Sequence, residues 1–190
     1  MTLRPAWTTS PAMDYRHALD YLLSFADYER ASASPIRYRD FNLERVRQLL
    51  SRVGNPEASF ASVHIAGTKG KGSTAAMVAS VLKEAGCRTG LYTSPHLHTM
   101  RERIAIDGSP ISEQEFAEGV DALQPAVAEV NAGCRWGRLT TFELLTALGF
   151  FCFAGRSVQL AVVEVGMGGR LDATNVLRPR VTAITSISLD

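Results

Sequence analysis

The feature that most constrains the fold is a glycine-rich heptapeptide between an apolar segment and a predicted helix. GTKGKGS, residues 67–73, directly follows the apolar segment 62–66. Glycines allow backbone N–H groups to converge on phosphate oxygens, and the N-terminus of the following helix adds partial positive charge. Lys71 supplies a point charge, and Ser73 or Thr74 can offer a hydroxyl. This context favours a phosphate-binding loop over a glycine-rich turn with incidental lysines.

The heptapeptide differs from two common nucleotide-binding patterns. It is not G-x-x-x-x-G-K-[ST], because Gly72 follows Lys71 and no glycine lies five residues before Gly70. It is not a dinucleotide fingerprint either, because Ala75 stands where the third glycine belongs, and Leu171 stands at that position after GMGG. A kinase or GTPase of the P-loop type is therefore disfavoured.

Predicted strands and helices alternate along most of the chain. Short apolar segments are typical of buried strands, and apolar residues spaced three and four apart are typical of helices. This alternation predicts an α/β fold with a doubly wound, mostly parallel sheet and helices on both faces. The expected strands cover 62–66, 89–93, 158–165 and 181–188, with a hairpin at 103–111. The expected helices cover 14–29, a segment after the cap Asn42, 73–85, a segment from the capping box Ser112–Glu115 to about Val130, and a buried segment from Thr141.

The composition excludes several classes of protein. Hydrophobic residues make up 46% of the chain, which is too many for a disordered protein. The net charge is +1 and no basic stripe is present, so neither nucleic acid nor an anionic membrane is an expected partner. No long apolar run predicts a membrane span, and the opening residues lack the apolar core of a signal peptide. Cys87, Cys134 and Cys152 are odd in number without a C-x-x-C pair, which argues against a disulfide framework or a zinc site.

The chain is expected to contain one domain and a short arm. Residues 1–13 are expected to form a flexible arm, since Pro5 and Pro11 lie within them, and residues 14–190 suit one domain. The sequence stops at Asp190 as a buried strand ends, so we expect it to be part of a longer protein, truncated at its C-terminal side. The uncovered sheet edge leads us to expect marginal solubility.

One acidic residue is a candidate metal ligand. Glu164 ends the apolar segment 158–165, where a buried carboxylate is costly unless it is paired or bound to a metal. An acid at a strand end beside a phosphate loop commonly holds Mg²⁺. The alternative is a carboxylate exposed to solvent. Asp172 is either a second acid of the site or a loop cap, and the sequence leaves both open.

The remaining polar candidates have ordinary structural interpretations. His64 is expected to be a packed core histidine, because it lies in the strand before the loop. His96 is expected to order its own loop, since no third zinc ligand is evident nearby. Arg101 and Arg103 are either a solvated charge run or neutralise charge near the phosphates, and this also stays open.

Four motifs together resemble the folylpolyglutamate synthase and dihydrofolate synthase family of the Mur ligase superfamily. GTKGKGST, TSPHL, RERIAI and EVGMGGRLDATN follow in the family's order between residues 14 and 190. The resemblance implies a fold of the Mur-ligase central-domain type. It also implies a cytoplasmic, monomeric ligase that uses ATP and Mg²⁺ to add L-glutamate to dihydropteroate or tetrahydrofolate through an acyl phosphate. Its partners would be these small molecules.

The resemblance also assigns roles to individual residues, with Lys71 and Glu164 in catalysis. ATP would be held by Thr68, Gly70, Lys71, Gly72 and Ser73, and Mg²⁺ by Ser94 and Glu164. The pterin-containing acceptor would contact Asp40, Leu43, Thr141, Phe142, Leu171, Asp172 and Ala173. Asn42 replaces a glycine of the family's D-x-G-L segment. A second metal-binding histidine, a modified lysine and a C-terminal lobe that helps to bind ATP and glutamate are missing, so this part alone is expected to be inactive.

Alternative functions remain open from the sequence. Another Mur-type ligase with a different acceptor would share the phosphate loop, although TSPHL and GGRLDATN argue against it. A nucleotide-binding module without catalysis would fit the missing lobe, although intact Lys71, Ser94 and Glu164 argue against it. The sequence does not distinguish dihydrofolate synthesis from polyglutamate extension.

Overall fold

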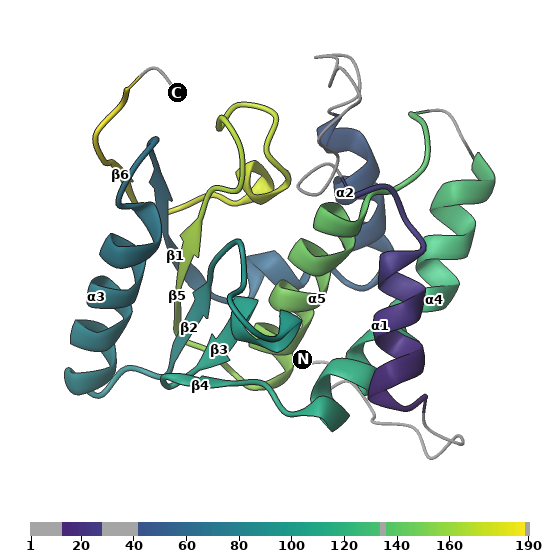
Figure 1. The fold of residues 1–190 in the computed structure, drawn as a ribbon, viewed down its shortest axis with the longest axis horizontal. Coiled ribbons are helices and arrows are strands. Elements are labelled where there is room, and N and C mark those ends of the chain that lie inside the picture. Colours follow the sequence, from purple (N-terminus) through teal and green to yellow (C-terminus); the bar gives the residue numbers. More distant parts are fainter. Residues whose placement is uncertain (1–12, 28–41, 134–135, 189–190) are drawn as a thin grey trace.

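The computed structural model describes residues 13–27, 42–133 and 136–188 and contains a six-stranded sheet of order β4-β3-β2-β5-β1-β6 (Figure 1). The strands β2, β5, β1 and β6 are parallel, and β3 and β4 form the antiparallel hairpin expected at one edge. The strand bounds are β1 Ala61–Ala66, β2 Thr89–Tyr92, β3 Ile104–Ile106, β4 Ser109–Pro110, β5 Leu160–Glu164 and β6 Val181–Ile184.

Helices cover both faces of this sheet, as the doubly wound prediction requires. The helix α3 packs on β1, β2 and β5 from one side, and the remaining helices lie on the other side (Figure 1). The helices are α1 Tyr15–Leu23, α2 Leu43–Arg52, α3 Lys71–Glu84, α4 Glu113–Gly133 and α5 Thr141–Gly155. The described residues also form the 3₁₀ turns η2 Pro56–Ala58, η3 Met100–Arg103 and η4 Ala173–Val176. None of the described helices has the length and apolar character needed to cross a membrane.

Side chains on the two faces of the central strand β5 pack into separate cores. Ala161 and Val163 belong to the large core under α1, α2, α4 and α5, whereas Val162 packs with Ile65 and α3. This alternation follows from the two-residue period of a strand. The helix α5 is buried nearly all round, as its apolar sequence predicts, and Cys152 lies in the large core with 2% of its surface exposed. The core is therefore thick on one face and thin on the other.

Side-chain caps begin the helices at the predicted residues. Asn42 accepts a hydrogen bond from the Glu44 N–H, and Ser112 and Glu115 form the expected reciprocal capping box before α4. At the end of α3, Gly86 takes a left-handed conformation with φ of 84°. Local sequence therefore defines these helix ends.

Several predicted boundaries are wrong. The helix α1 ends at Leu23, and α4 continues past Val130 to Gly133, where the Asn131 side chain accepts a hydrogen bond from the Leu139 N–H. The strand β6 ends at Ile184. The Thr185 N–H still donates to Ala66 of β1, but the Ser186 carbonyl accepts from Thr68 of the phosphate loop. Most of the predicted arm and the candidate Asp40 lie outside the described residues.

Candidate functional site

The phosphate loop lies where the sequence predicts it, between the carboxyl end of β1 and the first turn of α3. Gly67 and Gly70 take φ values of 137° and 83°, which favour glycine. A Cβ atom on Gly67 would lie 2.0 Å from the Thr185 Oγ1 atom, so no larger residue fits there. Gly70 caps α3 without a side-chain acceptor, which leaves the first N–H groups of that helix directed at the site.

Thr68 is engaged by the protein itself. Its N–H donates to the Ser186 carbonyl over 2.9 Å, and its hydroxyl donates to the Ser188 carbonyl over 3.2 Å. The segment that follows β6 therefore holds the outer side of the loop through Thr68. This geometry fits a residue that shapes the loop rather than one that offers a free donor to phosphate.

Glu164 is buried at the centre of the site, with 5% of its surface exposed. Its Oε2 atom accepts a hydrogen bond of 3.0 Å from the Ser94 N–H and would lie 3.4 Å from a Cβ on Gly72. Burial raises the pKa of this carboxyl, and the Ser94 N–H, the Lys71 charge and the Gly72 N–H partly oppose that rise. The structure thus brings together the predicted phosphate loop and both predicted magnesium ligands.

Nothing within the described chain neutralises Glu164 by direct pairing. The ion pairs between described residues all involve other carboxylates. Within the same residues, no three His, Cys, Asp or Glu side chains come together as a metal cluster. A cation at Glu164 would therefore take its other ligands from a hydroxyl, from substrate oxygens or from water, as Mg²⁺ commonly does.

Hydrogen bonds to Glu102 hold the loop that carries Ser94. The Glu102 carboxylate accepts hydrogen bonds from the N–H groups of Leu97, His98 and Thr99, and these bonds lower the pKa of Glu102. Its capping box with Thr99 begins η3. These bonds fix the backbone after Ser94, so the loop beside Glu164 is ordered by the protein itself.

The open question about the two arginines has a structural answer. Arg103 is buried and its Nε atom donates to His96 Nδ1 over 2.9 Å, so His96 orders its loop as expected. Arg101 donates to the Ile111 carbonyl over 2.9 Å and lies over the Tyr15 ring. Both side chains support the loop and the hairpin.

Part of the predicted acceptor pocket meets around Gly166. A Cβ atom on Gly166 would lie 2.4 Å from Cζ of Phe142 and 3.1 Å from Oδ2 of Asp172, so the ring and the carboxylate flank this backbone closely. Phe142 is half-buried and also contacts the Tyr92 ring. Leu171 and Ala173 follow in the same loop. Phe142 and Asp172 therefore lie next to the end of β5, whereas Ala173 begins η4 and is buried in the large core.

Asp172 acts as a loop cap. Its carboxylate accepts hydrogen bonds from the N–H groups of Met167 and Thr174 and from the Thr174 hydroxyl, and burial raises its pKa. The Thr174 hydroxyl uses its one proton in the hydrogen bond to Asp172. It therefore accepts the 2.8 Å hydrogen bond from His64 Nε2. His64 is buried, as predicted, and it anchors the loop to β1.

Thr141 and Leu43 lie deeper than the pocket prediction suggests. The Thr141 hydroxyl donates to the carbonyls of Leu22 and Phe25 at the end of α1, and 2% of the residue is exposed. Leu43 is buried in the large core, although its helix α2 packs against η4. Because a hydroxyl has one proton, Thr141 has no further donor for a ligand.

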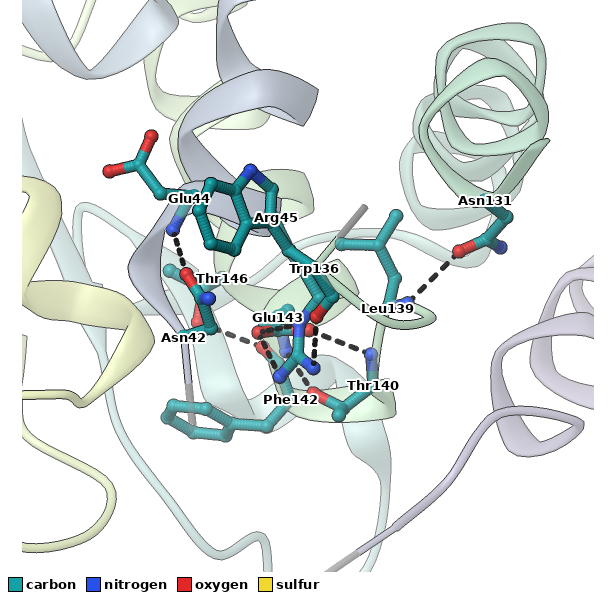
Figure 2. A network of polar contacts seen from close by, with 10 residues as sticks. All are labelled: Asn42, Glu44, Arg45, Asn131, Trp136, Leu139, Thr140, Phe142, Glu143 and Thr146. Carbon is teal, nitrogen blue, oxygen red and sulfur yellow. Dashed lines mark hydrogen bonds and ion pairs between the residues drawn. The ribbon is translucent and has the colours of Figure 1, made fainter. Parts of the chain in front are cut away.

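A buried ion pair beside Phe142 was missed from the sequence. Arg45 of α2 and Glu143 of α5 pair at 2.9 Å (Figure 2). The spacing of Thr140 and Glu143 fits a capping box, and that signal could have identified Glu143. No local pattern connects it with Arg45.

Comparison with known proteins places these features in a family. A scan of protein-family models gives no match. The dihydrofolate synthase/folylpolyglutamate synthase of Bacillus subtilis is 44% identical over 149 residues, which are 78% of this chain and 34% of that protein. The chain therefore spans about a third of this relative.

Solved structures agree with the sequence comparison. The folylpolyglutamate synthase of Thermotoga maritima superposes with a TM-score of 0.82 and 38% identity, covering 92% of this chain and 38% of that chain. A folylpolyglutamate synthase complex with AMPPCP and folate gives a TM-score of 0.83 at 35% identity, covering 94% of this chain and 41% of its own. The predicted Mur-ligase type of α/β fold is confirmed. By sequence and by fold, the chain matches part of the folylpolyglutamate synthases and dihydrofolate synthases, the family that its four motifs resemble.

Proposed function

We propose that the protein carrying this chain uses ATP to join L-glutamate to the carboxylate of dihydropteroate, of tetrahydrofolate, or of both. The observation that carries this proposal is the convergence of Glu164 with Gly72 of the phosphate loop and with Ser94. The names of the relatives and the solved complex with AMPPCP and folate support the same chemistry.

The nucleotide phosphates would lie at the N-terminus of α3. The N–H groups of Gly70, Lys71, Gly72 and Ser73 and the Lys71 ammonium would receive them. Thr68 contributes by holding the loop to the segment after β6, as its hydrogen bonds to Ser186 and Ser188 indicate. The phosphate loop is thus held by the segment after β6 before a ligand binds.

Mg²⁺ fits the ligands that the chain offers. Glu164 provides a buried carboxylate without an ion-pair partner among the described residues, and Ser94 lies beside it. When bound, the metal would neutralise charge on the phosphate oxygens. Glu164 and Ser94 would hold it next to the loop, while Lys71 adds a second positive charge.

The acceptor would lie against Phe142 and the loop 171–173. The half-buried ring of Phe142 offers an apolar face to a flat ring system, and the cap of η4 by Asp172 keeps the loop in place. Leu43 at the start of α2 and Thr141 at the start of α5 support this pocket from the core, and Asp40 is proposed as a further contact. The pocket adjoins Glu164 through Gly166.

The reaction requires positioning more than a protein nucleophile. An oxygen of the acceptor carboxylate attacks the γ-phosphorus of ATP, the bond to the bridging oxygen breaks, and ADP leaves. The glutamate amine then attacks the carbonyl carbon of the acyl phosphate, phosphate leaves with the bonding pair, and the amine releases a proton. Lys71 holds charge that develops on phosphate, and the loop aligns the phosphates for in-line attack.

We also infer that the protein works as a monomer in the cytoplasm on small-molecule substrates. The resemblance to the family is the support for the monomer and the cytoplasm. The net charge of +1 of this chain and the absence of a basic stripe in its sequence support small molecules over nucleic acid as its ligands. Sedimentation of the full-length protein with and without substrates tests the monomer.

Glutamate-dependent ADP release tests the proposal directly. The full-length protein is assayed with dihydropteroate and then with a reduced folate, and the preferred acceptor names the activity. Lys71→Ala is expected to lower the rate about 10²–10³-fold. Lys83→Ala, near the other end of α3, is the matched control and keeps the rate. Normal turnover by folded Lys71→Ala, or no release with either acceptor, contradicts the proposal.

A further inference from the structure

A polar network joins the N-terminal turns of α2 and α5 (Figure 2). The Arg45 guanidinium donates from Nε to Glu143 Oε1 over 3.0 Å, and its Nη2 atom lies 2.9 Å from the same oxygen. A third nitrogen, Nη1, donates to the Trp136 carbonyl over 3.2 Å. Glu143 thus contacts the edge of the guanidinium formed by Nε and Nη2. The third nitrogen bonds to the backbone of Trp136, which precedes α5.

Glu143 uses its second oxygen to fix the start of α5. Its Oε2 atom accepts a 2.8 Å hydrogen bond from the Thr140 N–H, while the Thr140 hydroxyl accepts from the Glu143 N–H over 3.2 Å. The Leu139 N–H is bound by Asn131 of α4. One carboxylate therefore caps α5 and connects it to α2.

Burying this pair costs free energy of desolvation, so a gain in stability does not account for its presence. Arg45 and Glu143 are 7% and 6% exposed, and burial raises the pKa of Glu143 while Arg45 opposes the rise. Apolar residues of the same shape often stabilise a protein as well as or better than a buried ion pair. A hydrogen-bonded ion pair has a preferred distance and angle between its two side chains. It can therefore fix the position of α5 relative to α2.

The residues beside this network belong to the acceptor pocket. Phe142 directly precedes Glu143, and its ring lies against the Gly166 backbone. Leu43 comes two residues before Arg45 on the first turn of α2. A shift of α5 along or around its axis would therefore move the Phe142 ring relative to Gly166.

We propose that the ion pair between Arg45 and Glu143 positions the acceptor pocket by holding the first turn of α5, and with it Phe142, in register with α2. This inference rests on the proposed function. Arg45 and Glu143 are positioning residues in this proposal, because they would act through the helix that carries Phe142. The phosphate loop lies on another helix, α3, so the nucleotide site is independent of the pair.

The expected kinetic result is selective. In the full-length protein, Glu143→Gln keeps the shape of the side chain but removes its charge and one of the two oxygens that accept hydrogen bonds. It should raise KM for the pterin acceptor about tenfold, while KM for ATP and kcat change less than about threefold. Arg45→Met should act in the same direction. Arg45→Lys, which keeps the charge, should restore part of the acceptor affinity.

A second ion pair on the same helix provides the control. Arg52 of α2 pairs with Glu129 of α4 at 3.0 Å, with side chains 37% and 67% exposed. Arg52→Met and Glu129→Gln remove equal charge from a pair that joins α2 to α4 instead of to α5, away from Phe142. Neither should change KM for the acceptor, which separates loss of positioning from loss of any ion pair on α2.

Three results would overturn the inference. A matched rise of both KM values, or a fall of kcat with unchanged acceptor KM, would show only structural loosening. An unchanged acceptor KM in folded Glu143→Gln would show that the pair positions nothing. If Glu143→Gln does not fold, Arg45→Lys and Glu143→Asp serve the same comparison. Wild-type turnover with either pterin separates these failures from failure of the proposed function, which would remove this inference as well.

Discussion

Two buried glutamates, Glu143 on α5 and Glu164 at the end of β5, have nearly equal exposure and different partners. Glu143 is 6% exposed and Glu164 is 5% exposed, and burial raises the pKa of both carboxyls. Glu143 forms a direct ion pair with Arg45 and caps its own helix. Glu164 receives the Ser94 N–H and lies near Lys71 without an ion pair among the described residues.

The comparison shows that burial by itself does not identify a functional acid. A buried carboxylate is costly unless something compensates its charge. At Glu143 the compensation is built into the protein, so that residue is structural. At Glu164 the compensation is incomplete, so a cation bound with substrate can supply the remainder. Mutations should therefore separate the two residues by the property that each changes.

The largest expected difference concerns turnover. Glu164→Gln should lower kcat about 10²–10³-fold, which corresponds to the loss of one well-placed charged contact. Glu143→Gln should change kcat less than about threefold, because it touches no reacting atom. The measurement is glutamate-dependent ADP release by the full-length protein at saturating ATP, Mg²⁺ and acceptor. Equal losses of kcat in the two variants would abolish the distinction.

Stability should show the reverse order. Glu143→Leu leaves Arg45 buried without its partner and should lower the free energy of local unfolding by about 3–5 kcal/mol. Glu164→Leu breaks no ion pair but leaves the Ser94 N–H without its acceptor, so it should cost less, about 1–3 kcal/mol. Hydrogen exchange of α2 and α5 amides in the full-length protein measures the first loss, and exchange of β5 amides measures the second. The double variant Arg45→Met/Glu143→Leu should recover most of the loss, and failure to do so would argue against the pair.

Phe142 can be displaced without touching either glutamate. Gly166→Ala would place a Cβ atom 2.4 Å from the Phe142 ring, so the ring must move. We expect KM for the acceptor to rise about tenfold, or about 1.4 kcal/mol, with KM for ATP unchanged. Gly133→Ala at the end of α4 has no atom within 4 Å of its Cβ and is the matched control. An unaffected acceptor KM would remove Phe142 from the pocket.

The smallest effect should come from the exposed pair of Arg52 and Glu129. Arg52→Met should lower local stability of α2 by about 0.2–1 kcal/mol, because water screens and solvates both charges. Raising the salt concentration should remove this difference while leaving the effect of Glu143→Leu in place. Hydrogen exchange at low and high salt tests this. A larger loss at Arg52 than at Glu143 would contradict the contrast between exposed and buried pairs.

Local patterns predicted much of the fold. Apolar periodicity located the parallel strands, and the caps at Asn42 and Ser112 began their helices at the expected residues. The phosphate loop and Glu164 were also found from the sequence, because a glycine-rich turn after a strand and an acid at a strand end each have a local signature. Boundaries failed where a distant contact decided them, as at Ile184, beyond which the backbone pairs with the phosphate loop.

The sequence by itself determined the alternation of strands and helices, the phosphate loop and the identity of the candidate acids. Only the tertiary structure decided which acid was already neutralised. Arg45 lies 98 residues from Glu143, and Ser94 lies 70 residues from Glu164. The tertiary fold likewise directed the Thr141 hydroxyl to the end of α1 and away from a ligand. Helix and strand periods reflect neighbours a few positions apart, whereas the charge partner of a buried group is set by which elements pack together.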